Sequence, residues 1–413
     1  MRDVMQYARD KAAQGMDWVD ARLPVTKLWN EQAGEYYAPK NFNFWYYFGS
    51  LALVVLVNQL LTGVWLTMNY KPSAADAFAS VEYIMRDVSW GWLIRYMHST
   101  GASMFFVVVY LHMFRGLIYG SYRKPRELVW LFGILIYLVL MGEAFMGYLL
   151  PWGQMSYWGA QVIISLFGAI PFVGEALAQF IRGDFVVSDV TLNRFFALHV
   201  IAMPLVLVGL VVAHLMALHE VGSNNPDGVE IKANLGSDGH PVDGITFHPY
   251  YTVKDLWGVV VFLALASVII FFAPEFGGYF LEHANFQPAD PLQTPEHIAP
   301  VWYFTPFYAI LRAVPSKLGG VIAMGGAVMI MALLPWLDRS PVKSIRYKGP
   351  LFKTALVLFV VSFIGLGYLG MNPPSPTYTM AARVLSVIYF AFFLLMPIYS
   401  SLDKTKPVPD RLT

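Results

Sequence analysis

The sequence of 413 residues contains no cysteine, and only 13% of its residues are charged, against about 25% in an ordinary soluble domain. Without cysteine this chain cannot carry disulfides, thiolate-bound iron–sulfur clusters or covalently attached c-type haem, so histidine remains as the strong ligand for iron. The scarcity of charge, together with 57% hydrophobic residues, indicates a protein whose solvent is lipid. A net charge of +1 argues against nucleic acid as a partner.

The segment 1–44 has no short apolar core before a small-residue cleavage site, and we therefore expect no signal peptide. It mixes charged and aromatic residues instead. We expect a cytoplasmic surface segment over residues 1–44, in part an amphipathic helix lying on the membrane.

Long apolar runs are what the sequence has in abundance. Eight of them are long enough to cross a bilayer, and they cover residues 46–68, 96–119, 128–150, 195–219, 256–274, 318–337, 352–371 and 383–402. The two long connections, 151–194 and 275–317, are rich in glycine, proline and aromatic residues, so we expect short interfacial helices in them. The sequence predicts an all-α integral membrane protein with eight transmembrane helices.

The distribution of lysine and arginine predicts the orientation. With eight spans and the N-terminus inside, 19 of the 28 basic residues fall on the inner side, 8 fall on or near the outer connections, and Arg115 lies within a span. The positive-inside rule then places both termini in the cytoplasm and the two long connections outside. A bacterial inner membrane is favoured over the mitochondrial one.

Two predicted spans each contain two histidines. His98 and His112 are separated by about four turns of an α-helix, and the step from His199 to His214 is one residue longer. At about 100° and 1.5 Å per residue, both steps return to nearly the same helix face about 21–22.5 Å further along. Two such helices facing each other would form two stacked two-histidine sites, each suited to a haem. A lone intramembrane histidine is more often a contact between helices, but four at matched depths favour haem ligation.

Glycines repeat with the same spacing as His98 and His112. They are Gly49 and Gly63 in the first span and Gly133 and Gly147 in the third. Bare backbone at two heights would let a flat macrocycle approach the helix closely. Ordinary packing of small residues between helices gives the same pattern. The glycines therefore favour haem binding only in combination with the histidine pairs.

Several motifs carry a resemblance to a known family. They are RYMHSTGASMFF, FRGLIYGSY, AFMGYLLPWGQMSYWGA, RFFALH, HLMALHEVGSNNP, FHPYYTVKD and VWYFTPFYAILRAVPSKLGG. Over nearly its whole length the chain resembles cytochrome b, the membrane-embedded subunit of ubiquinol–cytochrome c oxidoreductase (respiratory Complex III). The resemblance implies a diheme four-helix bundle over residues 45–220, an inner quinone-site loop over 221–255, and a C-terminal four-helix domain over 256–413 with an outer quinol-site loop at 275–317. It implies oxidation of ubiquinol at the outer site and reduction of ubiquinone at the inner one, coupled to proton translocation.

The resemblance also implies the haem ligands. His98 and His199 would bind the iron of the low-potential b-type haem near the outer face, and His112 and His214 that of the high-potential haem near the inner face. Two protein ligands leave no open position on the iron, so such haems carry electrons and do not bind oxygen. The second pair has one residue more than is usual in mitochondrial relatives. Because Pro204 removes a backbone donor between its ligands, we expect a distorted fourth helix.

Two arginines flank the first histidine pair, and Arg95 and Arg115 each lie three positions from a ligand. An unpaired arginine at membrane depth costs at least about 2.5–3.5 kcal/mol. The resemblance gives both arginines the role of binding haem propionates. Snorkelling to lipid headgroups is the alternative.

Polar residues at the inner ends of spans four and five suggest a quinone pocket. Reduction of a quinone consumes protons, which a titratable histidine and aspartate at the water boundary can relay. By resemblance His219 and Asp255 contact the quinone carbonyls, Ser223 and Asn224 assist, and Lys254 supports proton uptake. A polar loop that caps helix ends would also explain the turn-forming residues here.

At the outer quinol site the chain departs from the family pattern. The usual Pro-Glu-Trp-Tyr motif reads Pro300-Val301-Trp302-Tyr303, and valine cannot accept a proton from quinol. We expect the carboxylate of Glu296, a short distance upstream of Val301, to replace the missing one, although a hydrated surface glutamate is the alternative.

Other residues complete the expected outer site. His297 is expected to be structural, and Glu143 in span three is a weaker candidate for the proton acceptor. The residues that would line the pocket by resemblance are Tyr148, Trp158, Gly159, Tyr303 and Tyr308.

The partners implied are a Rieske-type iron–sulfur protein and a c-type cytochrome subunit, in a complex that is a homodimer as a whole. Two other classes of protein fit part of the pattern. A diheme quinone-reactive anchor of another respiratory dehydrogenase would be shorter and would lack the VWYFTPFYAILR region. A transporter with a histidine proton relay would contain no haem.

Overall fold

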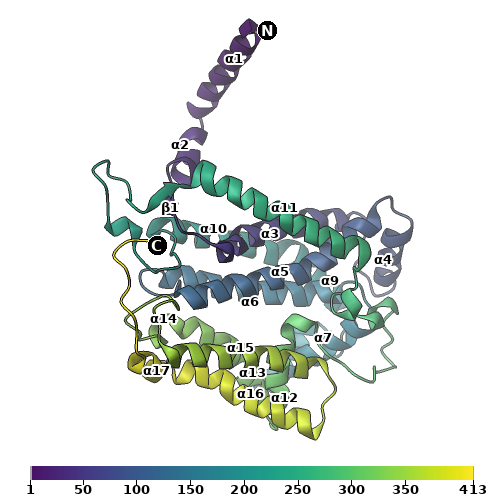
Figure 1. The fold of residues 1–413 in the computed structure, drawn as a ribbon. Helices are drawn as coiled ribbons and strands as arrows, with labels where there is room; N and C mark the ends of the chain where they lie inside the picture. The colour runs from purple at the N-terminus through teal and green to yellow at the C-terminus, as the bar shows by residue number, and fades with distance from the viewer. Residues whose placement is uncertain (1, 413) are drawn as a thin grey trace.

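Eight membrane-length helices lie side by side with roughly parallel axes in this computed structural model, which describes residues 2–412 (Figure 1). The eight predicted spans are confirmed, and their bounds are Phe44–Thr67, Gly91–Tyr119, Glu127–Leu149, Asp189–Val221, Phe247–Phe272, Lys317–Leu337, Pro350–Met371 and Pro376–Leu394. Such helices are apolar on all sides because lipid and neighbouring helices are both apolar, and because a helix satisfies its own backbone hydrogen bonds.

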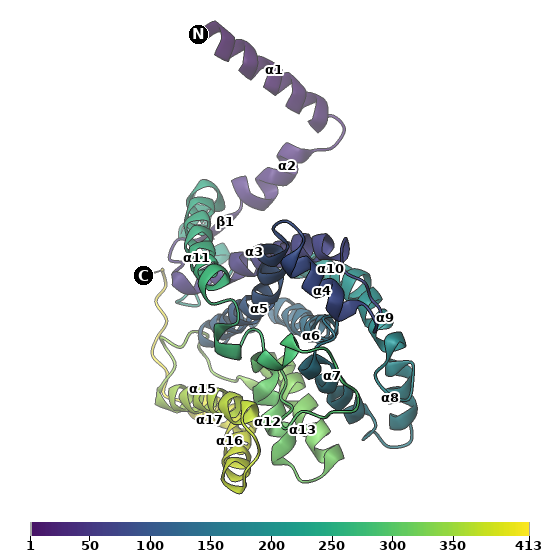
Figure 2. The ribbon, with the colours of Figure 1, turned by 90° about the vertical axis from the view of Figure 1, so that its right-hand side faces the viewer.

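The helices form two groups when they are viewed end-on (Figure 2). The first group comprises α3 (Tyr47–Thr67), α5 (Gly91–Tyr119), α6 (Glu127–Leu149) and α10 (Met203–Val221), with α11 (Thr252–Phe272) packed on α3 and α5. The second group comprises α12 (Thr305–Ala313), α13 (Lys317–Met329), α15 (Pro350–Met371) and α16 (Pro376–Leu394), with the short α14 (Leu334–Leu337) and α17 (Met396–Leu402) at one end. The histidine pairs lie in the first group.

Local sequence explains where several of these helices begin and end. Pro350 and Pro376 occupy the first helical position of α15 and α16, where the missing N–H has no cost. Gly120 ends α5 in the left-handed conformation with φ +66°, and a Cβ there would lie 2.7 Å from the carbonyl oxygen of Lys343. Glycine at this position therefore terminates the helix and also lets the backbone around Lys343 pack closely against it.

Short helices occupy the first of the two long connections, as the sequence predicted. They are α7 (Gln154–Phe167), α8 (Gly174–Arg182) and α9 (Asp189–Ala197), of which α9 is continuous with the fourth span. A further short helix, α4 (Ala77–Arg86), lies between the first and second spans. The outer connection after α11 contains 3-10 turns at Phe276–Gly278, His283–Phe286 and Trp302–Phe304. At the opposite end of the molecule, α1 (Arg2–Asp20) and α2 (Val25–Trp29) extend away from the bundle (Figure 1).

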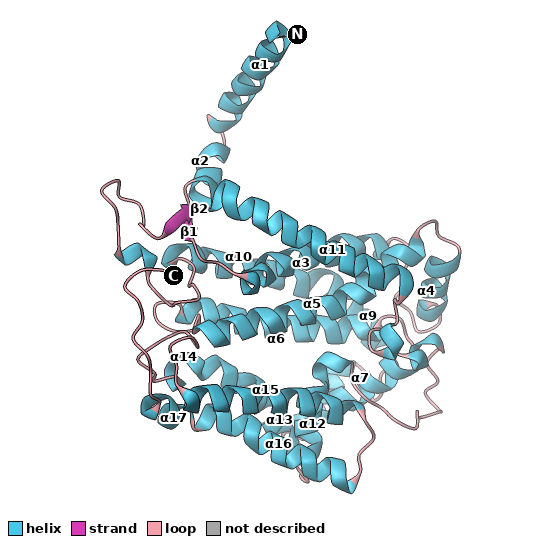
Figure 3. Cartoon of the chain, in the orientation of Figure 1, coloured by secondary structure: helices cyan, strands magenta, loops and turns pink. Residues whose placement is uncertain are grey.

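A short antiparallel ladder joins two segments that lie far apart in the sequence (magenta in Figure 3). Strand β1 (Tyr37–Pro39) pairs with β2 (Gly244–Thr246), with Tyr37 opposite Thr246 and Pro39 opposite Gly244. The ladder holds the segment before the first span against the loop before α11, and no pattern in the sequence predicts it.

The fourth span is distorted, as expected. Between α9 and α10 the chain forms a π-helical turn over Leu198–Ala202, in which the amide of Met203 donates to the carbonyl of Leu198. A π turn accommodates one extra residue within a helix. This turn contains His199, and it therefore absorbs the extra residue between His199 and His214.

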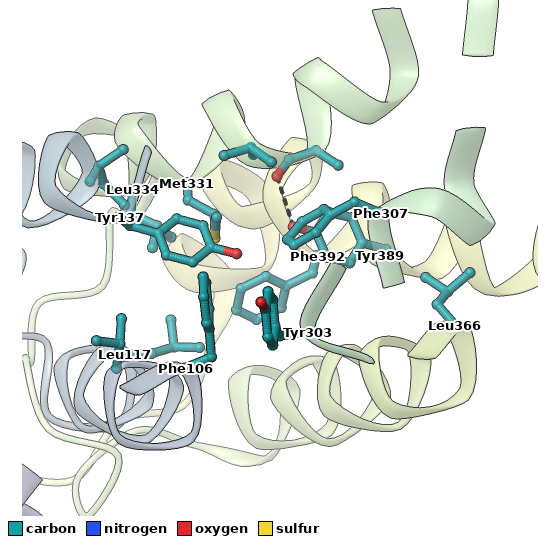
Figure 4. Close-up of a cluster of buried hydrophobic side chains, with 14 of the residues drawn as sticks. Phe106, Leu117, Tyr137, Tyr303, Phe307, Met331, Leu334, Leu366, Tyr389 and Phe392 are labelled. Atoms are coloured by element: carbon teal, nitrogen blue, oxygen red, sulfur yellow. Dashed lines mark hydrogen bonds between the residues drawn. The ribbon is translucent and has the colours of Figure 1, made fainter. Parts of the chain in front are cut away.

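An aromatic core joins the two helix groups (Figure 4). The ring of Tyr303 stacks on that of Phe106 in α5 with centroids 3.8 Å apart and planes inclined by 6°. The hydroxyl of Tyr110 donates to the carbonyl of Tyr303 at 2.5 Å. Tyr303 is buried, as is its neighbour Val301. The outer segment that contains the Pro-Val-Trp-Tyr motif is thus fixed to the first group.

Candidate functional site

The four histidines form two facing pairs between α5 and the fourth span. The ring centroids of His98 and His199 lie 6.2 Å apart and those of His112 and His214 lie 6.4 Å apart, with interplanar angles of 88° and 65°. A metal–imidazole bond of about 2 Å, with about 1.2 Å from nitrogen to ring centre, would place two imidazoles that bind one metal ion from opposite sides about 6.4 Å apart. Both pairs therefore have the separation of two axial ligands on one iron.

Four glycines face these histidines from α3 and α6. A Cβ built on Gly63 would lie 3.2 Å from Cε1 of His98, and one built on Gly49 would lie 3.4 Å from Cε1 of His112. On Gly133 a Cβ would lie 3.5 Å from Cε1 of His214. On Gly147 it would collide with the imidazole of His199. Any larger side chain would fill the space beside the imidazole. The two flanking helices therefore leave room for a flat group at both depths, which fits a haem.

The outer pair has partners that fix its tautomers. The hydroxyl of Thr62 donates to the carbonyl of Asn58 at 2.6 Å, so its oxygen accepts the Nδ1–H of His98 at 3.0 Å. Nδ1 of His199 lies 3.0 Å from the carbonyl oxygen of Glu143. A donor hydrogen bond from Nδ1 leaves Nε2 free to bind a metal.

The structure gives Glu143 a role that the sequence did not suggest. Its Oε1 lies 3.0 Å from Nδ1 of His199, and its Oε2 is buried without a hydrogen-bond partner within the described residues. The side chain thus supports a haem-ligand candidate from α6.

Neither flanking arginine has an acidic partner among the described side chains, those of residues 4–412. Arg95 makes no ion pair there, and Arg115 donates to Ser121 Oγ at 3.2 Å and lies over the ring of Tyr46 at 4.9 Å, with its Nε unpaired. A charge within the membrane requires a counter-ion. The carboxylates of a haem would supply one at each depth.

Two of the five predicted inner-site residues, Lys254 and Asp255, line a pocket near the inner ends of α3 and α11. It is lined by Phe42, Asn43, Tyr46, Tyr47, Phe247, Tyr251, Lys254 and Asp255. Nζ of Lys254 donates to the carbonyl of Phe42 at 2.6 Å. The predicted Lys254 and Asp255 thus share one pocket with aromatic rings, which suits a planar ligand.

His219 and Ser223 lie beside a residue that the sequence did not single out. The ring of Tyr36 stacks on the imidazole of His219 with centroids 4.4 Å apart, and its hydroxyl lies 3.2 Å from Ser223 Oγ. Tyr36 also packs near Phe247, a lining residue of the inner pocket. The β1–β2 ladder places it there, because the amide of Phe247 donates to the carbonyl of Tyr36 at 2.7 Å.

Ionic and polar contacts hold the loop after α10. Arg126 is 3% exposed and donates to both carboxylate oxygens of Glu230, at 2.7 and 2.8 Å. Burial opposes ionisation of Glu230, but Arg126 and Lys343 outweigh it and lower its pKa to about 2. Nδ2 of Asn224 donates to the carbonyl of Tyr119 at 2.8 Å, which fixes this predicted site residue to the inner end of α5.

The residues expected at the outer quinol site have different surroundings in the structure. Tyr148 and Gly159 are neighbours, because a Cβ built on Gly159 would lie 3.9 Å from the Tyr148 ring. Indole Nε1 of Trp158 donates to the carbonyl of Asp290 at 3.2 Å. The ring of Tyr308 lies beneath Arg312 at 4.7 Å, and its hydroxyl donates to the carbonyl of Ile298 at 3.4 Å, just before the motif.

The residues of the Pro-Val-Trp-Tyr motif and the residues just before it also have different surroundings. Trp302 donates from its indole to Ser103 Oγ at 3.1 Å, and Pro300 precedes the buried Val301. Glu296 is exposed, whereas Nε2 of His297 lies 3.1 Å from the carbonyl oxygen of Met371 and so has a structural contact.

Sequence reasoning also missed Glu282. Its Oε2 accepts a hydrogen bond from the hydroxyl of Tyr148, and Asn285 donates to that hydroxyl at 2.8 Å. Burial raises the pKa of Glu282 to about 7, although the hydrogen bond from Tyr148 opposes the shift. Nothing in the local sequence distinguishes Glu282 from the other acidic residues of its loop.

Eight spans around two opposed histidine pairs define a membrane-bound cytochrome, and comparison with known proteins agrees. The family model "Cytochrome b/b6/petB" matches residues 33–222, and "Cytochrome b(C-terminal)/b6/petD" matches residues 288–390. The chain is 66% identical to cytochrome b of Allochromatium vinosum over 408 residues, which cover 97% of this chain and 98% of that one. It is 50% identical to cytochrome b of Rickettsia prowazekii over 398 residues, which cover 96% and 97%.

A solved structure is similar as well. A chain of a hyperthermophilic respiratory Complex III matches with a TM-score of 0.86 and 42% identity, covering 94% of this chain and 98% of that one. The chain belongs to the cytochrome b family, and membership implies that it binds b-type haem.

Proposed function

We propose that the chain holds two b-type haems, one between His98 and His199 near the outer end and one between His112 and His214 near the inner end. The observation that carries this proposal is the separation of 6.2 and 6.4 Å between facing imidazoles at two depths. The outer haem is the low-potential one and the inner haem the high-potential one. Each haem supplies reversible one-electron transfer when it is bound.

As a cytochrome b of a respiratory Complex III, the chain is the catalytic core of a quinol–cytochrome c oxidoreductase. Ubiquinol is oxidised at the outer end and ubiquinone is reduced at the inner end. The histidine pairs, about 21–22.5 Å apart along each helix, connect the two ends across most of an apolar core about 30 Å thick. This separation of the two quinone sites couples turnover to proton translocation.

The residues around each haem position have complementary tasks. Arg95 and Arg115 bind the propionates, and both lack an acidic partner in the described part of the chain. The glycines of α3 and α6 admit the macrocycle. Two imidazoles of this chain would bind each iron, and they would leave no coordination site for oxygen.

At the inner site, His219 and Asp255 contact the two quinone carbonyls, and Ser223, Asn224 and Lys254 support them. The pocket beside Lys254 and Asp255 and the polar contacts of Asn224 support this assignment. Reduction of quinone takes up two protons, and an imidazole and a carboxyl group at the membrane edge can deliver them from the inner water phase.

At the outer site, aromatic residues and the turn of the Pro-Val-Trp-Tyr segment enclose the quinol. The residues proposed to line it are Tyr148, Trp158, Gly159, Pro300, Val301, Trp302, Tyr303 and Tyr308, with Glu296 as the proton acceptor expected from the sequence. The burial of Tyr303 and the proximity of Gly159 to the Tyr148 ring support a shared site.

The protein is a multi-pass inner-membrane protein and part of a multi-subunit complex. Within that complex we propose a Rieske-type iron–sulfur protein and a c-type cytochrome as partners, because a chain without cysteine cannot hold their redox centres. Both termini face the cytoplasm, in line with the excess of lysine and arginine on that side, and the complex is a homodimer.

The test is the haem content of the assembled complex. Reduced-minus-oxidised spectra and haem extraction should give two b-type haems per chain, and His214→Leu should leave only the outer haem, identified by its lower midpoint potential. Fewer than two b-type haems in the parent chain would contradict the proposal. A content unchanged in His214→Leu would contradict the ligand assignment.

A further inference from the structure

The outer site contains a half-buried carboxyl group that the motif does not supply. Glu282 accepts a hydrogen bond from the Tyr148 hydroxyl, and that hydroxyl in turn accepts one from Asn285 Nδ2 at 2.8 Å. Tyr148 belongs to α6, the helix that also presents Gly147 to His199. The carboxyl group therefore lies beside Tyr148, which is proposed to contact quinol and which directly follows Gly147 in the sequence.

The loop that carries Glu282 is held in one conformation. Oδ1 of Asn285 accepts from the amide of Ser156 at 2.8 Å, at the first turn of α7. A Cβ on Gly153 would lie 2.8 Å from Cα of Asn285, so only glycine permits this close approach. The amide of Gln154 donates to the carbonyl of Gln287 at 3.0 Å. These contacts hold the outer loop against the Pro-Trp-Gly-Gln segment and keep Glu282 at Tyr148.

The other carboxyl groups of the outer loop have different surroundings. Glu275 lies 3.4 Å from the imidazole of His283, whose side chain is 74% exposed. Asp290 and Glu296 are exposed. Burial raises the pKa of Glu282 to about 7, so this group can change its protonation state near neutral pH.

The titratable groups that face Glu282 are Tyr148 and Tyr303. Burial raises the pKa of Tyr303, and the nearby Glu282 carboxylate raises it further, so this phenol stays protonated while the carboxyl group titrates. The hydroxyl of Tyr148 donates directly to the carboxylate. The arrangement thus contains one group able to accept a proton near pH 7 and a hydroxyl able to orient it.

We propose that Glu282 accepts one of the two protons released when quinol is oxidised at the outer site, in place of the carboxylate that Val301 cannot provide. The inference depends on the proposed outer quinol site. One O–H bond of quinol breaks and its proton moves to a carboxylate oxygen of Glu282. The second proton leaves toward the iron–sulfur partner, and the two electrons go, one each, to that partner and to the haem pair, giving quinone.

The test compares three variants in the assembled complex, each checked for two b-type haems. Glu282→Gln removes the acceptor, Glu296→Gln removes the acceptor expected from the sequence, and Glu275→Gln is the matched control in the same loop. At pH 8, where Glu282 is ionised, we expect Glu282→Gln to oxidise quinol about 100-fold more slowly than the parent. Glu275→Gln should stay within about twofold of the parent, and Glu296→Gln should slow the reaction less than Glu282→Gln.

The pH profile distinguishes proton acceptance from a structural role. Protonation of Glu282 below its pKa removes the acceptor, so the parent rate should fall as the pH decreases from 8 to 6, around the pKa of about 7. Glu282→Gln should be slow and should lack this acid limb. In the double variant Glu282→Gln/Val301→Glu, a carboxylate at the motif position should raise the rate of quinol oxidation at least tenfold above that of Glu282→Gln.

The outcomes separate the inference from the function on which it depends. Parent-like rates in Glu282→Gln overturn the inference, and a larger loss in Glu296→Gln overturns it in favour of Glu296. If Glu282→Gln does not assemble, Glu282→Asp decides, because a shifted acid limb supports the inference and an unchanged profile overturns it. If the parent complex itself oxidises no quinol, the proposed outer site is wrong.

Discussion

Gly147 in α6 lies so close to the imidazole of His199 that a single methyl group on its Cα would collide with the ring. Gly63 makes the equivalent approach to His98 from α3, with 3.2 Å between an added Cβ and the imidazole. The outer histidine pair is thus enclosed by bare backbone on both sides. These glycine positions leave space beside the imidazoles. Substitutions that add a few side-chain atoms test whether that space is needed.

We expect Gly147→Val to eliminate the outer haem and to leave the inner one, because the added atoms would occupy the space beside His199. Gly209→Val in α10 is the matched control, since nothing lies within 4 Å of a Cβ at that position. Redox titration of the b-type absorbance in the purified complex measures both haems. Two unchanged haems in Gly147→Val would contradict the enclosed arrangement.

Thr62→Val should raise the midpoint potential of the outer haem and leave that of the inner haem unchanged. The hydroxyl oxygen of Thr62 accepts the Nδ1–H of His98 at 3.0 Å, and losing this acceptor makes the imidazole a weaker base that stabilises ferric iron less. Thr67→Val is the control, because that hydroxyl donates to the carbonyl of Val64 on an exposed turn. A lowered potential, or an equal shift in both haems, would argue against His98 as the ligand.

Glu230→Gln should destabilise the inner loop in a pH-dependent way. Arg126 and Lys343 hold the pKa of Glu230 at about 2 against an ordinary value of 4.5, so the ion pair stabilises the fold above pH 4.5, and this stabilisation is lost as the pH falls toward 2. We expect a cost of about 1–2 kcal/mol at pH 7, limited because the Glu230 side chain is 36% exposed.

The thermal midpoint of haem loss measures this effect. The difference between parent and Glu230→Gln should be largest near pH 7 and should shrink at pH 3. Glu31→Gln, which removes a pair of 3.8 Å between exposed side chains, should have little effect at either pH. A difference that grows as the pH decreases would contradict the assigned ion pair.

The sequence predicted the spans from the length of its apolar runs, and it predicted the shared face of each histidine pair from the helical spacing. A helix that crosses lipid must be long and apolar, so the number of spans follows from hydropathy, and steps of about four helical turns return side chains to one helix face. Even the distortion near Pro204 was predictable, and the structure shows it as the π-helical turn that contains His199. The facing of His98 and His199, and of His112 and His214, agrees with that prediction.

The quinone sites were less accessible to such reasoning. Lys254 and Asp255 share a pocket as expected. Tyr36, however, is brought to His219 by the β1–β2 ladder, which pairs the segment before the first span with the loop before α11. Two such short β-strands have no hydrophobic period that reveals their pairing. At the outer site, Glu296 stays a prediction, and the structure places Glu282 at Tyr148 instead.

The amino-acid sequence by itself determined that this chain crosses the membrane eight times and presents two imidazoles on one face of each of two helices. Both properties are local to a single helix, because the first depends on the length of an apolar run and the second on the helical period. Only the tertiary structure decided which glycine faces which histidine and which acidic residue of the outer loop meets Tyr148. Those relationships depend on loop conformation and on contacts between distant segments, where burial and hydrogen bonding select one of several similar side chains.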